Sequence, residues 1–405
     1  MAEQPGDRRA DAGAKAGPRT LRRRQTSVDS TVTVTRASRG GSTASVVRMQ
    51  NRPVEVSLDV NPASRLDVID IGQAVKDEHG DTLQPFPRAL YCSFHTTAGY
   101  LDQSLATRLQ QEGEPGVEPF VKVFQTIFPE GAGYEHDKLE LRTELSEEQK
   151  RNEPQNADSH LAFIGAGLRN CVTYVNRPNE PVYFVDLDGV NEGQPRHRQT
   201  TVVGFNHEEE VVRERLVIPV SAHPIDSVNL KDPRLGLYEQ IQALTDKYDV
   251  AKGRVVIELA PGERHAGLTV NEYETLLMRH DLAEVLREPL RFMREKASHL
   301  FARPGAIANR SLDYAKYDMV RVFNQLFDHF AMNESMVERL AARVLAVPAS
   351  RFLRMKRSVS LLVSDRETEG RGRPVQGTYQ SPILVQWAKA QPQQREVDVI
   401  LTRFR

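Results

Sequence analysis

Hydrophobic and polar residues alternate along several short stretches of the chain, and this period of two predicts β-strands. The stretch 54–60, Val-Glu-Val-Ser-Leu-Asp-Val, is expected to form a half-buried strand. Along 88–95, successive side chains point to opposite faces, so Tyr91, Ser93 and His95 share a mixed polar face opposite an apolar one. Further strands are expected at 66–71, 171–175, 182–187 and 200–205.

Helical periodicity marks two segments between these strands. From Pro119 to Pro129, large apolar residues recur on one stripe, which predicts an amphipathic helix. A second helix is expected to begin near Asn156, Asp158 or Ser159, each of which can cap it, with His160 in its first turn. The positive end of the helix dipole disfavours a charged imidazole there and offers a site for an anion such as phosphate. The stretches 78–87 and 138–155 are expected to be loops, the second of them flexible.

The second half of the chain repeats the pattern of the first. The stretch 216–224 resembles 54–62, 254–268 resembles 88–100, and three late strands resemble the three that close the first half. The repeat predicts two similar α+β domains, 49–207 and 208–405, each with a mixed, mostly antiparallel sheet covered by helices. The late strands are expected at 358–363, 382–387 and 397–404. A helical insertion in the second domain is marked by three apolar sets: Leu276, Leu277, Val285, Leu286, Leu290 and Met293; Val320, Phe323, Leu326, Phe327 and Phe330; Met336, Val337, Leu340 and Val344.

Charge and composition narrow the classes of partner. The 405 residues carry a formal net charge of -1, so no nucleic-acid partner is expected. Residues 1–48 are rich in Arg, Ala, Gly, Ser and Thr and hold almost nothing large and apolar, which predicts a disordered tail. No apolar run approaches the ~20 residues of a membrane span, so no membrane partner is expected. The two cysteines, Cys92 and Cys171, offer no disulfide framework, which favours a cytoplasmic protein.

Three histidines lie in segments that carry further polar groups. His95 ends a predicted strand, Tyr134-Glu135-His136-Asp137 follows a glycine-rich turn, and Asp158-Ser159-His160 opens a predicted helix. If the three imidazoles meet, they can hold a divalent metal such as Zn or Mg, with Asp137 or Asp158 as a ligand or as a partner that orients a ligand. They can equally act as acid, base and anion binder without a metal, because histidine titrates near neutrality. The sequence leaves both chemistries open.

Other residues near these segments are candidates for binding a substrate. Thr96 and Thr97 can donate hydrogen bonds to a phosphate, or can satisfy the end of their own strand. Arg196 and Arg198 suit bidentate recognition of an anion, although alternating charge on an edge strand would look the same. Tyr134 is placed either to close over a ligand or to pack in the core.

Taken together, the first-half motifs resemble the YjbQ family, also called UPF0047. They are His95-Thr96-Thr97-Ala98, Tyr134-Glu135-His136-Asp137, Asp158-Ser159-His160, a strand ending in Asp188-Gly189, and a basic last strand from Arg196 to Phe205. The second half resembles the same family more faintly and keeps other pieces, namely Gly267-Leu268-Thr269-Val270-Asn271-Glu272-Tyr273 and Gly377-Thr378-Tyr379-Gln380. Glu263 falls where the second half would carry the counterpart of His95.

The resemblance implies an enzyme for a small phosphorylated or anionic metabolite, with chemistry like that of a thiamine-phosphate synthase, and a homo-oligomer. Because each half lacks what the other keeps, a composite site is expected. The histidines come from the first half, and Asn271, Glu272, Tyr379 and Gln380 come from the second. Two alternatives remain, a metal-dependent hydrolase with the same residues and a non-catalytic protein that binds a ligand or serves assembly.

Overall fold

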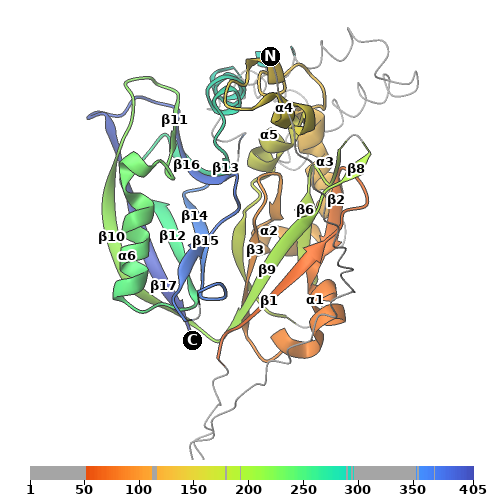
Figure 1. Cartoon of the computed structure of the whole chain (residues 1–405), viewed down its shortest axis with the longest axis vertical. Coiled ribbons are helices and arrows are strands. Elements are labelled where there is room, and N and C mark those ends of the chain that lie inside the picture. Colours follow the sequence, from red (N-terminus) through yellow and green to blue (C-terminus); the bar gives the residue numbers. More distant parts are fainter. Residues whose placement is uncertain are drawn as a thin grey trace, which may run out of the picture. The chain divides into compact units, whose positions relative to one another are not determined.

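The computed structural model describes residues 52–111, 116–177, 180–191, 193–288, 291–292, 295, 353, 355–368 and 370–405 (Figure 1). These residues belong to one compact unit. The predicted tail 1–48 and the predicted helices around Val320–Phe330 and Met336–Val344 lie outside the described residues. No helix within the described ranges is long and apolar enough to cross a membrane.

The first half forms two antiparallel sheets. The larger has the order β1-β9-β3-β5, with β1 at Val54–Val60, β9 at Arg198–Phe205, β3 at Arg88–Ser93 and β5 at Cys171–Val175. The smaller has the order β2-β6-β4, with β2 at Asp67–Asp70, β6 at Tyr183–Asp186 and β4 at Ala98–Tyr100. A short hairpin, β7 at Val190–Asn191 and β8 at Gln194–Pro195, leads into β9. The strands predicted from alternation are confirmed to within a few residues.

The second half has the same strand order, with one strand, β15, added at the end of its larger sheet. Its larger sheet is β10-β17-β12-β14-β15, and its smaller one is β11-β16-β13. The bounds are Glu208–Pro219 for β10, Gln394–Phe404 for β17, Gly253–Leu259 for β12, Ser358–Ser364 for β14, Arg373–Val375 for β15, Asp226–Asn229 for β11, Gln380–Gln386 for β16 and Ala266–Glu272 for β13. Every strand pair in the described ranges is antiparallel, so the expectation of mixed sheets is wrong.

The helices differ from the predictions in several places. The predicted loop 78–87 begins inside α1 (Ile71–His79) and continues as a 3₁₀ turn at Gly80–Leu83. The stretch 138–155 is not a loop throughout, because it holds a 3₁₀ turn at Leu139–Leu141 and α4 at Glu147–Asn152. Ser146 and Gln149 form a reciprocal capping box on α4, a signal that the sequence carries and that was missed. Helix α6 (Leu237–Lys247) was not predicted.

Four elements occur where helices were predicted. They are α3 at Val117–Ile127, α5 at Ala157–Ala166, a π-helical turn at Leu277–Asp281 and α7 at Leu282–Arg287. Helix α1 and helix α2, at Gln103–Leu109, were not predicted. All ten residues of α5 are buried, and Gly167 ends the helix in the left-handed conformation that glycine adopts without strain. The polar first turn of α5 is therefore held inside the protein.

Hydrophobic packing joins the two halves. One core cluster unites first-half residues such as Phe128 and Tyr134 with Leu277 and Ile383 of the second half. A smaller cluster lies between the larger sheets, where the Phe205 and Phe404 rings stack with centroids 4.0 Å apart and planes 7° from parallel. The register of β3 and β5 places Cys92 opposite Cys171 in the same cluster, with their sulfur atoms 2.8 Å apart.

Candidate functional site

Two of the three predicted histidines form a buried pair. The His136 and His160 rings lie nearly perpendicular, with centroids 5.3 Å apart, and each residue is 1% exposed. His160 occupies the first turn of α5, as predicted. His136 is held by the second half at two points. Its Nδ1 lies 2.9 Å from Glu274 Oε2, and its backbone N–H donates to Asp281 Oδ2.

Asn271 sets the tautomer of His160. The backbone N–H of Glu272 donates to Asn271 Oδ1 at 2.8 Å, which identifies this atom as the amide oxygen. His160 Nδ1 lies 2.6 Å from the same oxygen, so Nδ1 must carry the proton and donate it. His160 Nε2 is then the unprotonated nitrogen, and it faces Glu272 Oε2 at 3.6 Å. One histidine therefore offers a free lone pair next to a carboxylate.

The surroundings move the pKa values of the two imidazoles in opposite directions. Burial and the charge of His136 lower the pKa of His160 to about 3. Burial also opposes the charged form of His136, but the hydrogen bond to Glu274 and the charge of Glu272 outweigh it and raise the pKa of His136. Burial would raise the pKa of Glu274, yet the hydrogen bonds from His136 and from the backbone of Leu276 and Leu277 lower it to about 2. The surroundings thus favour the charged form of His136 and the neutral form of His160.

A buried arginine contacts the glutamate that faces His160. Arg142 is 3% exposed and donates to three carboxylates, at 2.7 Å to Glu144, 3.0 Å to Glu153 and 3.2 Å to Glu272. Glu272 therefore lies between Arg142 and His160. This arginine comes from the 3₁₀ turn region that the sequence suggested was flexible.

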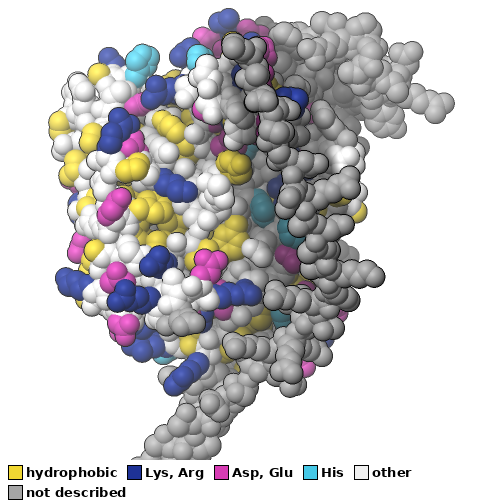
Figure 2. Space-filling model, in the orientation of Figure 1, with side chains coloured by type: hydrophobic (Ala, Val, Ile, Leu, Met, Phe, Trp, Pro, Cys, Tyr) yellow, Lys and Arg dark blue, Asp and Glu magenta, His cyan; other side chains and the backbone are white. Residues whose placement is uncertain are grey.

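An open cleft lies over the glutamates and Arg142. Arg142, Glu272 and Glu274 line it together with residues of β11, the π-helical turn, and Thr378 and Tyr379. Three cations on its walls, Lys231, Arg279 and Arg287, form no ion pair with any described residue. Elsewhere on the visible face, side chains of opposite charge are interspersed (Figure 2).

His95 is not joined to the pair. Strand β3 ends at Ser93, two residues earlier than predicted, and His95 Nε2 accepts a hydrogen bond of 2.8 Å from the backbone of Gln199. Burial and the charge of Arg198 lower the pKa of His95 to about 3. Within the described ranges, no hydrogen bond or ring contact links His95 to His136 or His160, and no three His, Cys, Asp or Glu side chains are grouped so as to hold a metal ion. The predicted trio is a pair and a separate histidine.

Asp137 and Asp158 act on the start of α5. Asp137 Oδ1 accepts from the backbone N–H of Ala157 at 3.0 Å, so a carboxylate of the protein already occupies the helix end where an anion was expected. Asp158 is 3% exposed and takes two hydrogen bonds from Arg65, at 2.9 and 3.0 Å. Burial nevertheless raises the pKa of Asp158 to about 7 against the attraction of Arg65. Both carboxylates orient the helix that carries His160.

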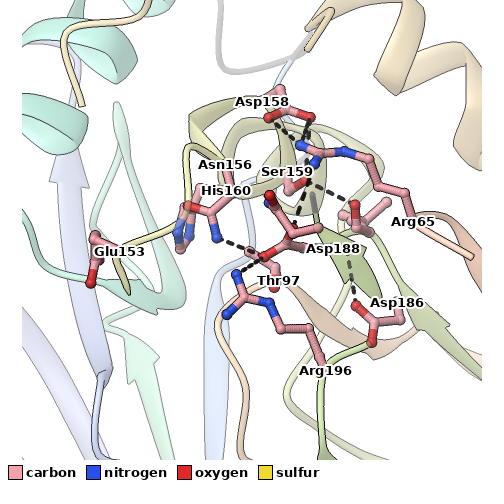
Figure 3. Close-up of polar contacts among 12 residues, drawn as sticks. Arg65, Thr97, Glu153, Asn156, Asp158, Ser159, His160, Asp186, Asp188 and Arg196 are labelled. Atoms are coloured by element: carbon pink, nitrogen blue, oxygen red, sulfur yellow. Dashed lines mark hydrogen bonds and ion pairs between the residues drawn. The ribbon is translucent and has the colours of Figure 1, made fainter. Parts of the chain in front are cut away.

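A network of arginines and carboxylates surrounds this helix start (Figure 3). Arg196 donates to Asp188 at 2.9 Å, and Arg198 makes two hydrogen bonds to Asp186, at 2.6 and 2.9 Å. In Figure 3 the His160 ring lies on the Glu153 side of this network. Because β9 lies between β1 and β3, Arg198 does not lie on an edge strand, which was the plain alternative. Arg196 lies between β8 and β9. Arg198 is 7% exposed, so its side chain is buried in the interior.

The other residues that were predicted to bind a ligand differ in how deeply they are buried. Thr97 is 2% exposed and accepts from Arg198, whereas Thr96 is only partly buried. Tyr134 is fully buried, donates to the Pro129 carbonyl and packs 6.1 Å from the Phe292 ring centroid. Tyr134 is therefore a core residue, as its alternative interpretation stated.

The second half contributes to the site through a turn as well as through β13. Gln380 Nε2 donates to the carbonyls of Ser93 and His95, at 3.0 and 2.7 Å, and so clamps the end of β3. A Cβ on Gly377 would lie 1.9 Å from the Phe94 carbonyl oxygen, so only glycine allows this approach. Tyr379, 69% exposed, lies on the wall of the cleft and not at the histidine pair.

Hydrogen bonds in the second half parallel those around His95. The backbone of Glu396 donates to Glu263 Oε1 at 2.8 Å, as Gln199 donates to His95. Arg395 of β17 donates to Gln386 of β16, as Arg198 of β9 donates to Asp186 of β6. Glu263 thus accepts the same kind of backbone hydrogen bond as His95 does.

Sequence reasoning missed Arg142, Glu274 and Asp281. The sequence carried only a weak signal for Glu274, which lies two residues after the Asn271-Glu272 motif. Arg142 and Asp281 stand in charged or helical stretches without any distinguishing pattern. Both act on residues more than a hundred positions away in the chain, a contact that periodicity does not reveal.

Comparison with known proteins gives structural neighbours only. No protein-family model and no curated protein matches the chain. A solved YbjQ-like protein of unknown function from Sulfolobus solfataricus P2 is 16% identical, and the match covers 49% of this chain and 99% of that one with a TM-score of 0.26. An uncharacterized conserved protein of the YjbQ/UPF0047 family from Clostridium acetobutylicum is 12% identical, with coverage of 47% and 99% and a TM-score of 0.24.

A hypothetical protein from Aeropyrum pernix K1 is also similar, at 14% identity, with coverage of 47% and 98% and a TM-score of 0.25. The structural neighbours thus include YjbQ/UPF0047-family proteins over about half of the chain, which is the family that the sequence motifs resemble. At these TM-scores the likeness carries no argument about activity, and the chemistry below rests on the geometry of the site.

Proposed function

We propose that this chain is an enzyme that moves a proton on a small anionic, phosphorylated metabolite, with His136 and His160 as its acid and base. The observation that carries the proposal is the buried pair of imidazoles, whose surroundings raise the pKa of one and lower the pKa of the other. Titratable neighbours whose environments push their pKa values apart are the usual basis of paired acid and base roles. Because structural ion-pair networks also shift pKa values, the proposal rests as well on the tautomers of the two imidazoles and on the neighbouring cleft.

The tautomers define the roles. His136 Nδ1 donates to Glu274, and its Nε2 is buried without a hydrogen-bond partner in the described structure. As an imidazolium, His136 can give the Nε2 proton to a substrate atom and is left neutral. His160 Nε2 can accept a proton, while Asn271 holds Nδ1–H and Glu272 stabilises the imidazolium that forms. A substrate in the cleft reaches the two imidazoles only after Glu272 and Arg142, which line the cleft, are displaced or move aside.

The cleft supports an anionic substrate. Lys231, Arg279 and Arg287 bring positive charge to its walls without a carboxylate partner among the described residues. Burial lowers the pKa of Lys231, which is consistent with a partly desolvated position. A phosphate or pyrophosphate group would find three cations there, and the family resemblance makes transfer with loss of pyrophosphate, like that of a thiamine-phosphate synthase, the reaction class to test first.

The proposed site is a product of duplication. The matching strand orders and the parallel hydrogen bonds at His95 and Glu263 support two YjbQ-like copies. In this proposal the first copy supplies His136 and His160, and the second supplies Asn271, Glu272 and Glu274. Assembly into a homo-oligomer belongs to the same family expectation.

The second candidate is a metal-dependent hydrolase. In its favour, each imidazole has an oxygen acceptor at Nδ1, the arrangement that orients metal-ligating histidines, and His136 Nε2 has no partner. Against it, Arg142 already neutralises Glu153 and Glu272, and His95 is not with the pair. The residues present therefore do not fit a bound divalent ion, and we assign no step to one.

The test is a thermal-shift screen of phosphorylated metabolites, followed by turnover assays on each hit. Ligand binding raises the melting temperature by mass action. His160→Gln is expected to bind the hit and to lose turnover by about 10²- to 10⁴-fold, the contribution typical of a general base. His197→Gln is the matched control, because His197 is exposed. Binding without turnover by the wild type would favour a non-catalytic ligand-binding protein.

A further inference from the structure

Two thiols meet inside the cluster between the larger sheets. Cys92 of β3 lies directly opposite Cys171 of β5, and their sulfur atoms are 2.8 Å apart. The next pair along the ladder is hydrogen-bonded, because the Ser93 N–H donates to the Asn170 carbonyl at 2.7 Å. The two cysteines therefore form a non-hydrogen-bonded pair, in which Cα atoms are about 4.5 Å apart and side chains approach most closely. That separation lies within the range of about 4.4 to 6.8 Å that a disulfide spans.

The surroundings of the two thiols select the kind of oxidant that can act on them. Both cysteines are buried, in a cluster that also holds Phe205 of the first half and Phe404 of the second. Thiol–disulfide exchange passes through a mixed disulfide, which needs room for a bulky partner that a packed apolar cluster does not give. A peroxide is nearly as small as water and needs no such room. Burial also raises the pKa of the Cys92 thiol, so its reaction with a peroxide should be slow.

We propose that Cys92 and Cys171 are a modification site at which a peroxide forms a disulfide without unfolding the protein. One thiol is oxidised to a sulfenic acid as the O–O bond of hydrogen peroxide breaks and one water leaves. The second thiol attacks that sulfur, the S–S bond forms, and a second water leaves. The two sulfurs together lose two electrons, which the peroxide accepts, and both thiol protons end in water. The sulfurs need to approach by less than about 1 Å to reach the bonded distance.

The disulfide would close a loop that carries both histidines of the pair. Cys92 and Cys171 are 79 positions apart in the chain, and His136 and His160 lie between them. A cross-link over so long a loop stabilises the folded state mainly by restricting the unfolded chain. The melting temperature of the oxidised protein is therefore expected to exceed that of the reduced protein by about 5 °C.

The experiment treats reduced, folded wild type with hydrogen peroxide, removes the excess with catalase, and counts thiols by alkylation in urea without a reductant. The chain has only two cysteines, so the count is expected to fall from two to none, and a reductant should restore both. A non-reducing gel should show the monomer, and peptide mapping should find Cys92 joined to Cys171. Cys171→Ala keeps a small apolar side chain and is the matched control, whose melting temperature should not rise after the same treatment.

Three results would overturn the proposal. One is that both thiols of the treated protein still react in urea. Another is that the reductant restores neither thiol, which marks oxidation of single sulfurs to sulfinic acid. The third is that the disulfide forms only when peroxide is added to protein already unfolded in urea. Each of these results is read on the wild type, so the test stands even if Cys171→Ala does not fold.

Discussion

Glu274 offers the sharpest test of how the two halves hold the histidine pair. Its carboxylate accepts from His136 Nδ1 and from the backbone N–H groups of Leu276 and Leu277, each at 2.7 to 2.9 Å. Glu274→Gln keeps the size of the side chain but removes the charge. It also turns one acceptor into a donor, so that one of these N–H groups loses its partner.

The magnitude follows from the pKa of Glu274. A fall from the ordinary 4.5 to about 2 corresponds to about 3 kcal/mol of native-state stabilisation, at about 1.4 kcal/mol per unit. Because the Glu274 side chain is only 5% exposed, solvent screening reduces this free energy only slightly. A loss of about 3 kcal/mol also matches the cost of breaking a buried ion pair at one partner.

The stabilisation should depend on pH in a defined window. The pKa of Glu274 is depressed, so its contribution is present above about pH 4.5 and is lost as the pH falls towards about 2. The pKa of His136 is raised, so its contribution is present below about pH 6.5 and is lost as the pH rises through its folded value. The wild type should exceed Glu274→Gln in stability most between about pH 4.5 and 6.5.

Urea unfolding followed by circular dichroism at about pH 3, 5.5 and 8.5 measures this difference. Glu147→Gln is the control, because Glu147 forms an exposed pair with Lys150 and its loss should cost less than about 1 kcal/mol. A cost for Glu274→Gln below about 1 kcal/mol at pH 5.5, or one that is equal at all three pH values, would refute the reasoning.

Three further predictions concern the clamp on β3 and the cysteines. Gln380→Ala should cost about 1 to 3 kcal/mol of unfolding free energy, because two carbonyls at the end of β3 lose their donor; an unchanged urea midpoint would contradict this. Gly377→Ala should destabilise by more than Gln380→Ala, since its Cβ would overlap the Phe94 carbonyl oxygen, and the melting temperature measures the difference. Burial raises the pKa of the Cys92 thiol, so native protein should alkylate at Cys92 and Cys171 only after urea is added, as mass spectrometry can show.

Local patterns predicted much of the fold. Alternation located β1 and β5 to within a residue, and the stripe that ends at Pro129 located α3. Such predictions succeed because side-chain periodicity reflects burial of one face. The loop 138–155 failed for a different reason: its charged residues satisfy one another and a capping box, which periodicity does not register.

The candidate site was predicted in its parts and not in its assembly. Motif order pointed to His136, His160, Asn271 and Glu272, and these four lie together. His95 carried the same type of signal, yet its Nε2 is used by the backbone of Gln199. A motif names a residue type at a position, but it does not say which neighbour will take its hydrogen bond.

The sequence by itself determined the strand pattern, its repetition in the second half and the histidine-bearing segments, because these depend on spacing along the chain. Only the tertiary structure decided which groups meet. It paired His136 with Glu274 and placed Arg142 against Glu272, across 138 and 130 positions of the chain. The physical reason is that protonation states and charge neutralisation depend on distances of about 3 Å between groups whose separation in sequence sets no limit on their separation in space.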